Sequence, residues 1–201
     1  MKQALDHLTA ADPILRQVIE GVGPYGIEFL DPNFETLVKA IVLQQLSGKV
    51  AQIIFDRLIA ATGARPLTPE AVLKLRTPKL RAIGLSKQKI AYIRDIARRI
   101  VRGQLDLAGL TRLTDTEVHR TLTAIKGIGP WTVHMFLIFA LRRLDVMPSG
   151  DLGIRVAIRQ VYGLSETPSP AEVDRLALKW RPYCTVASWY LWRSLEAKAG
   201  L

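Results

Sequence analysis

The sequence predicts an all-α protein. Apolar residues recur at helical spacing along most of its 201 residues. Capping residues, prolines and glycines mark the ends of these segments, and no segment alternates convincingly with a period of two. A chain of this length forms one large domain or two small lobes. Hydrophobic residues make up 49% and charged residues 23% of it, which excludes intrinsic disorder of the whole chain.

The first half of the chain contains six predicted helices. Asp12 and Pro13 form an N-cap and N1 pair that begins a helix ending at Gly21 to Gly23. The next helix places seven residues on one face, namely Phe34, Leu37, Val38, Ile41, Val42, Gln45 and Leu46. Further helices are expected to begin at Ser47, Thr68, Thr77 and Lys87. Basic residues of the last helix are interpreted as a mostly solvated face: Lys87, Lys89, Arg94, Arg98, Arg99 and Arg102.

The second half contains the remaining predicted helices, about ten in all. Thr114 and Glu117 have the spacing of a capping box, as do Ser169 and Glu172. Pro130 begins a strongly apolar helix that is expected to reach about Leu144. The last three helices are expected over residues 151–162, from residue 169 and over residues 185–198.

The charge balance indicates a polyanionic partner. The chain has 28 Lys and Arg against 18 Asp and Glu, a net charge of +10. Nucleic acid is the commonest partner of such a protein, although an anionic membrane surface or a functionally neutral basic surface fits the charge as well. The apolar run of residues 135–141 is far short of a membrane span. The N-terminus lacks a secretory pattern, so we expect a cytoplasmic protein that does not enter a membrane.

Cys184 is the single cysteine of the chain. It excludes an intramolecular disulfide, a cysteine-based zinc site and a cysteine-ligated iron–sulfur cluster. The three histidines have no metal-ligand spacing. No required cofactor is therefore expected.

The most informative segment is a hairpin over residues 122–132. Gly127 and Gly129 flank Ile128 between two predicted helices. In such a tight turn Ile128 packs inward, and the backbone amides can all face outward at the N-terminus of the next helix, where an anion binds. An ordinary turn between two helices is the alternative explanation of the glycines alone.

Four segments, which occur along the chain in the order found in the family, resemble the helix–hairpin–helix (HhH-GPD) superfamily of DNA glycosylases. The resemblance extends over about residues 34–192. Residues 125–132 resemble the hairpin, and residues 147–155 resemble the motif with the following aspartate, Asp151. Residues 41–47, and residues 84–89 with Tyr92, are similar to the alkylbase branch, represented by 3-methyladenine DNA glycosylase II.

The resemblance implies a two-lobed helical glycosylase. We expect a monomer that lacks the N-terminal β-domain of the longer bacterial enzymes of this type. One lobe is expected over residues 31–144, and the other over residues 1–30 plus 145–201. Such an enzyme excises alkylated bases from double-stranded DNA in base excision repair, and must flip the nucleotide out of the duplex.

The resemblance also implies site residues. Base-pocket residues are Trp131, Met135, Tyr183 and Gln45, and Leu46 is a wedge that fills the gap left by the flipped nucleotide. Each of these side chains has core packing as its alternative role. Trp189, Tyr190 and Trp192 are interpreted as core residues. The expected phosphate contacts are Lys126, Gly127, Ile128, Gly129 and Thr132. A structural Na⁺ or K⁺ is implied at the backbone carbonyls of Thr123, Ile125 and Ile128.

Asp151 is the expected catalytic residue. Breaking the N-glycosidic bond develops positive charge on the sugar, which a nearby carboxylate stabilises while it orients water. Asp151 is also placed to cap the helix that follows it, and capping alone is the alternative. We expect both roles.

The family members that also cut the strand carry a lysine where this chain has Trp131. Lys126 precedes the turn, which suits a phosphate contact or a solvated charge. The sequence therefore predicts a monofunctional enzyme with water as the nucleophile. A bifunctional glycosylase/lyase and a non-catalytic hairpin DNA-binding protein are the alternatives, and the sequence leaves the preferred base open.

Overall fold

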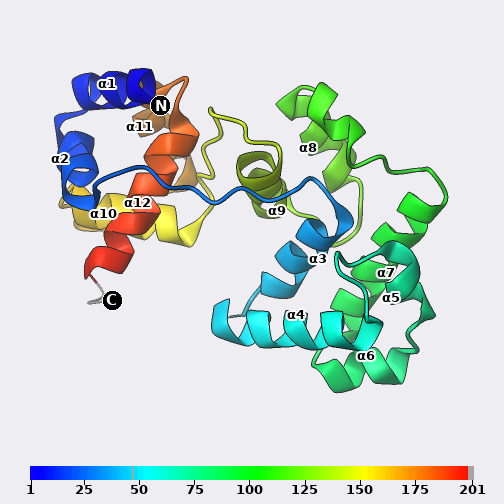
Figure 1. Cartoon of the computed structure of the whole chain (residues 1–201). Helices are drawn as coiled ribbons and strands as arrows, with labels where there is room; N and C mark the ends of the chain where they lie inside the picture. Colours follow the sequence, from blue (N-terminus) through cyan, green and yellow to red (C-terminus); the bar gives the residue numbers. More distant parts are fainter. Residues whose placement is uncertain (47, 199–201) are drawn as a thin grey trace. The chain divides into compact units, whose positions relative to one another are not determined.

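The computed structural model describes residues 1–46 and 48–198, and all regular structure in these residues is helical (Figure 1). The all-α prediction is confirmed for them. Ser47, where a helix was expected to begin, lies outside the described residues. Within the described part, no helix has both the length and the apolar character needed to cross a membrane.

The chain divides into two compact units. Unit 1 combines Met1–Phe29 with Arg142–Leu201, and unit 2 is Leu30–Leu141. The boundaries expected from the sequence were 30/31 and 144/145. The aspartate motif thus belongs to unit 1, and the hairpin belongs to unit 2.

Unit 1 is built around its last helix. Its α-helices are α1 (Lys2–Ala11), α2 (Pro13–Val22), α10 (Leu152–Val161), α11 (Pro170–Ala177) and α12 (Cys184–Lys198), with a short 3₁₀ turn η3 (Leu178–Trp180). Helix α12 packs against α2 and α10 and contributes the fully buried Tyr190 and Leu191 to the core. Helix α1 was not predicted from the sequence, because it has no capping side chain at its N-cap Met1.

A buried carboxylate joins the two chain segments of unit 1. Asp12 is 1% exposed and caps α2, where its Oδ1 accepts the amides of Ile14 and Leu15 at 3.1 Å. Its Oδ2 accepts a hydrogen bond from Trp180 Nε1 at 2.8 Å and another from the Tyr162 hydroxyl. Lys179 Nζ lies 2.9 Å from the same oxygen. The N-terminal helices are thereby fixed to residues more than half the chain away.

Unit 2 carries the hairpin. Its elements are α3 (Phe34–Leu43), α4 (Gly48–Thr62), α5 (Pro69–Lys74), α6 (Thr77–Ile83), α7 (Lys87–Val101), η1 (Gly109–Arg112), α8 (Asp115–Thr123), α9 (Pro130–Met135) and η2 (Phe136–Ala140). Helix α7 packs against α5, α3 and α6. Its apolar face, which includes Ile90, Ile93 and Ile96, is buried.

Two predicted helices end earlier than expected. Helix α3 ends at Leu43, and Gln45 has a left-handed φ of 57°, so Gln45 and Leu46 do not continue its apolar face. The predicted helix 130–144 is α-helical only to Met135 and continues as the π-helical turn η2 to Ala140. Hydrophobic spacing alone does not distinguish a π turn from an α turn.

Candidate functional site

The hairpin of unit 2 contains two isoleucines whose side chains are buried. Helix α8 ends at Thr123 and α9 begins at Pro130. Ile125 is 3% exposed and Ile128 is 4% exposed, which confirms that Ile128 packs inward. The turn is therefore anchored in the core of its unit.

The amides of the turn do not all face outward. The Ile128 amide donates to the Ile125 carbonyl at 3.1 Å, inside the turn. This corrects the prediction that the Ile128 amide contacts a phosphate. None of the hydrogen bonds among the described residues uses the Gly127 or Gly129 amide, so these two remain the amides suited to an external anion.

The two glycines have different structural requirements. Gly127 has φ of 93°, and a Cβ there would lie 2.2 Å from the ring of Tyr92 on α7. Gly129 is the extended N-cap of α9, and a Cβ there would meet nothing within 4 Å. Gly127 is thus required by the packing of the turn, whereas Gly129 borders open space.

Thr132, in the first turn of α9, is buried beside the hairpin and does not contact solvent. Its side chain is 2% exposed, and its Oγ1 accepts a hydrogen bond from Gln44 Nε2 at 3.1 Å. The buried hydroxyl is engaged by Gln44, so the phosphate contact predicted for Thr132 stays a prediction that concerns its backbone amide at the start of α9. Lys126, by contrast, is exposed, as a phosphate contact requires.

The predicted wedge lies in an exposed turn. We call Gln45 and Leu46 the wedge turn. Leu46 is 37% exposed, so it is not a core residue, and Gln45 beside it is exposed as well. On α9, Trp131 and Met135 are both partly buried and lie one helical turn apart, which places them on one face.

Asp151 of unit 1 accepts hydrogen bonds from a backbone amide and an indole. It is the N-cap of α10, and its Oδ1 accepts the Ile154 amide at 2.9 Å. The same oxygen accepts a hydrogen bond from Trp192 Nε1 at 2.9 Å. The predicted capping role is confirmed, and the indole fixes the carboxylate in addition.

Trp192 packs partly buried against the core of unit 1, as expected for a core residue, and it also donates to Asp151. Gly153 makes room for this contact, because a Cβ there would lie 3.0 Å from Asp151 Oδ1 and 3.3 Å from Trp192 Cδ1. A glycine two residues after a capping aspartate is the one local signal in the sequence for such a close approach.

Comparison with known proteins identifies the family. Residues 38–182 match the HhH-GPD superfamily base excision DNA repair protein family. The chain belongs to this family. It is 37% identical over 195 residues to DNA-3-methyladenine glycosylase 1 of Schizosaccharomyces pombe. The matched region covers 94% of this chain and 85% of the relative.

Two solved structures are similar to this HhH-GPD protein. The 3-methyladenine DNA glycosylase of S. pombe in complex with abasic DNA has a TM-score of 0.89 at 34% identity, covering 96% of this chain and 97% of that one. The DNA-3-methyladenine glycosidase of Bacillus halodurans has a TM-score of 0.85 at 37% identity, covering 98% and 91%. Both agree with the helical fold described above.

Other aromatic residues of unit 1 of this HhH-GPD protein pack together. Tyr183 is partly buried against the core, with its ring 5.5 Å from that of His7, so its base-pocket role stays a prediction. Tyr190 is fully buried, and Trp189 stacks edge-on against it with ring centroids 4.9 Å apart. These two fit the core role expected for them.

A metal ion could be held in two ways, either through side chains or through the backbone carbonyls of the hairpin. Among the described residues, no group of three His, Cys, Asp or Glu side chains is placed to hold a metal. Burial raises the pKa of the Cys184 thiol, and the neighbouring Asp145 raises it further. Thr123 is the last residue of α8, where helix carbonyls lack intrahelical partners, and Ile125 and Ile128 lie in the turn that follows. Such uncharged oxygens suit a monovalent cation, which stays a prediction.

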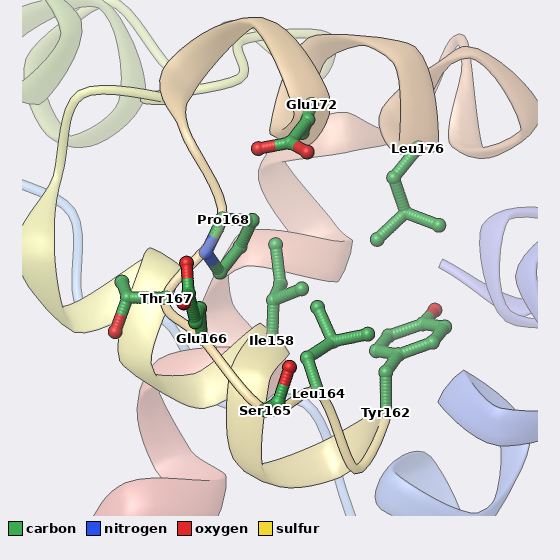
Figure 2. A pocket seen from close by; sticks show the side chains of 9 residues that line it. All are labelled: Ile158, Tyr162, Leu164, Ser165, Glu166, Thr167, Pro168, Glu172 and Leu176. Carbon is green, nitrogen blue, oxygen red and sulfur yellow. The ribbon is translucent and has the colours of Figure 1, made fainter.

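Unit 1 also has a surface cavity of about 450 Å³ between α10 and α11 (Figure 2). Its apolar side chains, Ile158, Leu164 and Leu176, gather on one side, with Glu166 and Glu172 at the other. The cavity lies at the C-terminal end of α10, and Asp151 is at the N-terminal end. It contains none of the predicted site residues.

Proposed function

We propose that this protein is a monofunctional DNA glycosylase that hydrolyses the N-glycosidic bond of alkylated, 3-methyladenine-type bases in double-stranded DNA. The observation that carries the proposal is Asp151, a carboxylate fixed by the Ile154 amide and the Trp192 indole, each at 2.9 Å. The similarity to DNA-3-methyladenine glycosylase 1 over 94% of the chain supports the substrate class.

The proposed chemistry requires an extruded nucleotide, because the bond to be cut is inaccessible within a duplex. Loss of the base leaves positive charge on the sugar. The Asp151 carboxylate stabilises this charge and orients the attacking water. The electron-rich ring of Trp131 suits a cationic alkylated purine by stacking and cation–π attraction.

The substrate is tested with a panel of duplexes that each carry one lesion. The lesions are 3-methyladenine, 7-methylguanine, 1-methyladenine and hypoxanthine, and free base is measured by chromatography. We expect release of 3-methyladenine. Failure to release any of the four bases, with the fold intact by circular dichroism, would contradict the proposal and favour a non-catalytic DNA-binding protein.

Water is the proposed nucleophile, because Trp131 occupies the position of the lysine in strand-cutting relatives and an indole cannot form a Schiff base. Incubation of the wild type with a lesion duplex and borohydride should trap no covalent adduct and should leave an intact abasic strand. A trapped complex that disappears in Lys126→Met would instead make this protein a glycosylase/lyase.

Substitution of Gly129 by alanine should weaken duplex binding without destabilising the fold. The backbone of Gly129 is extended and a Cβ meets no neighbour, but its methyl group would occupy the space through which a phosphate reaches the amides. We expect about a tenfold loss of affinity for damaged and undamaged duplexes alike, measured by fluorescence anisotropy, because backbone contacts read no base.

Gly127→Ala is the matched comparison for this substitution. It combines a strained φ with a clash against Tyr92, so it should also lower the melting temperature. If Gly129→Ala lost affinity only for lesion duplex, the hairpin would contact the base pocket rather than the backbone.

Trp192→Phe should reduce the rate of base release about 10- to 100-fold, the effect of removing one hydrogen bond to a charged group. The phenyl ring keeps the packing but cannot donate to Asp151 Oδ1. Single-turnover rates and duplex affinities separate the two effects, and affinity should be unchanged. Trp189→Phe is the control, since Trp189 stacks on Tyr190; equal rate losses in both variants would assign Trp192 to packing alone.

The proposed enzyme acts as a monomer in the cytoplasm. Its net charge of +10 suits a DNA partner. Sedimentation of the protein with a short duplex should give a 1:1 complex, and a 2:1 complex on a single lesion would contradict the monomer.

A further inference from the structure

The C-terminus of α3 is capped by a lysine from α7. Lys89 Nζ lies 2.8 Å from the carbonyl oxygens of both Val42 and Gln44. Burial lowers the pKa of this ammonium group, and the two carbonyl oxygens at a helix C-terminus offset the cost of burying the charge. Lys89 is therefore not part of a solvated face, contrary to the sequence interpretation.

The side chain of Gln44 continues this connection to the hairpin. Its Nε2 donates to the Gly127 carbonyl at 3.0 Å and to Thr132 Oγ1 at 3.1 Å. The backbone of Gln44 is thus held by α7, while its side chain is held by Gly127 in the turn and by Thr132 in the first turn of α9. One residue carries both connections.

A third contact makes this arrangement closed. The ring of Tyr92, on α7 one turn after Lys89, lies against Gly127 so closely that no Cβ fits there. Helix α7, the end of α3 and the hairpin therefore each contact the other two. A closed set of contacts resists deformation better than a chain of two.

The wedge turn begins directly after Gln44. Gln45 has a φ of 57°, a left-handed conformation that residues other than glycine adopt only when their surroundings impose it. Leu46 follows it and is 37% exposed. An exposed leucine on a strained turn needs a firm support if it is to enter a base stack.

We propose that Lys89 and Gln44 are positioning residues that hold the wedge turn rigidly against the hairpin, so that Leu46 enters the duplex as the hairpin binds the backbone. This inference rests on the proposed function, because it concerns the step that precedes base removal. Because the wedge turn is already ordered in the free protein, binding costs no free energy to order it. The free energy gained from contacts with the DNA backbone can then offset the cost of unstacking the bases.

The test measures wedge insertion without base excision. The probe is a duplex with 2-aminopurine beside a tetrahydrofuran abasic analogue, and its fluorescence rises when the neighbouring stack is disrupted. Lys89→Met should reduce this rise, and the preference for the abasic analogue over undamaged duplex should fall about tenfold. Affinity for undamaged duplex and the melting temperature should stay near those of the wild type.

Lys87→Met is the matched control, because Lys87 is the exposed first residue of the same helix and loses the same charge. Gln44→Met provides a second variant if Lys89→Met fails to fold, and it should show the same loss of insertion. Equal insertion by Lys89→Met and Lys87→Met would overturn the proposal. So would parallel losses of stability and of binding to both duplexes, which indicate a purely structural lysine.

The two proposals fail separately. A wild type that gives the fluorescence rise but releases no base would contradict the glycosylase function and leave the positioning role intact. A wild type that releases base, with insertion unaffected in Lys89→Met and Gln44→Met, would contradict the positioning role alone.

Discussion

Replacement of Asp151 by asparagine is expected to abolish base release and to leave duplex binding close to that of the wild type. The amide oxygen can still accept from the Ile154 amide and Trp192 Nε1, which both bind Oδ1, so the geometry of the site is kept. The negative charge that stabilises the sugar cation is lost. We expect a fall in single-turnover rate of about 10³-fold or more, measured on a 3-methyladenine duplex.

Asp145→Asn is the control for this substitution. Asp145 also belongs to unit 1, and its carboxylate pairs with Arg181 at 2.7 Å; we expect this variant to remain active. Asp151→Ala adds the loss of the helix cap, which costs about 1 kcal/mol of stability, and a thermal melt separates that effect from catalysis. If Asp151→Asn released base at a rate within tenfold of the wild type, Asp151 would be a helix cap and nothing more.

The features predicted best from the sequence are those set by neighbouring residues. The Thr114–Glu117 and Ser169–Glu172 pairs both form complete capping boxes, because each box needs only residues three positions apart. Asp151 was expected at an N-cap on the same grounds. The hairpin, with its inward Ile128, also follows from local turn chemistry.

The features that were missed depend on contacts between distant residues. Gln45 continues the apolar pattern of α3, but α3 ends before it, where Lys89 from α7 binds the last carbonyls at 2.8 Å. Trp192 looks like any aromatic residue of a core helix, and its bond to Asp151 spans 41 positions. Periodicity describes one element at a time and carries no information about such pairs.

The same limit applies to polar contacts in the hairpin and on α7. The sequence showed which residues surround the turn but not which face Thr132 presents. Its hydroxyl accepts a hydrogen bond from Gln44, 88 positions earlier. Arg94 was also assigned to the solvated face of α7, yet it donates to the Leu75 carbonyl at 2.6 Å and to Thr77 Oγ1 at 2.8 Å. A long polar side chain that bonds to another element cannot be told from a solvated one until the packing of the helices is known.

Replacement of Asp12 by alanine is expected to cause a large loss of stability. The substitution removes the N-cap of α2, worth about 1 kcal/mol. It also leaves the buried Trp180 Nε1–H without its acceptor, which costs about 1–3 kcal/mol. The combined loss, about 2–4 kcal/mol, is a large fraction of the stability of an ordinary domain. Thermal and urea unfolding measure it, with Asp6→Ala on the exposed face of α1 as the control.

The stability difference between the wild type and Asp12→Ala should also depend on pH. Burial alone raises the pKa of Asp12, but hydrogen bonds from Tyr162, Lys179 and Trp180 outweigh it, and the net pKa lies below its ordinary value. A carboxyl with a lowered folded-state pKa contributes stability above its unfolded pKa of about 3.9, and this contribution is lost as the pH falls through the folded-state pKa. The difference should therefore stay constant from about pH 5 to 8 and narrow below about pH 4. A difference that widened in acid would mean that Asp12 is protonated in the folded protein, and the ion pair with Lys179 would then have no role in joining the two chain segments of unit 1.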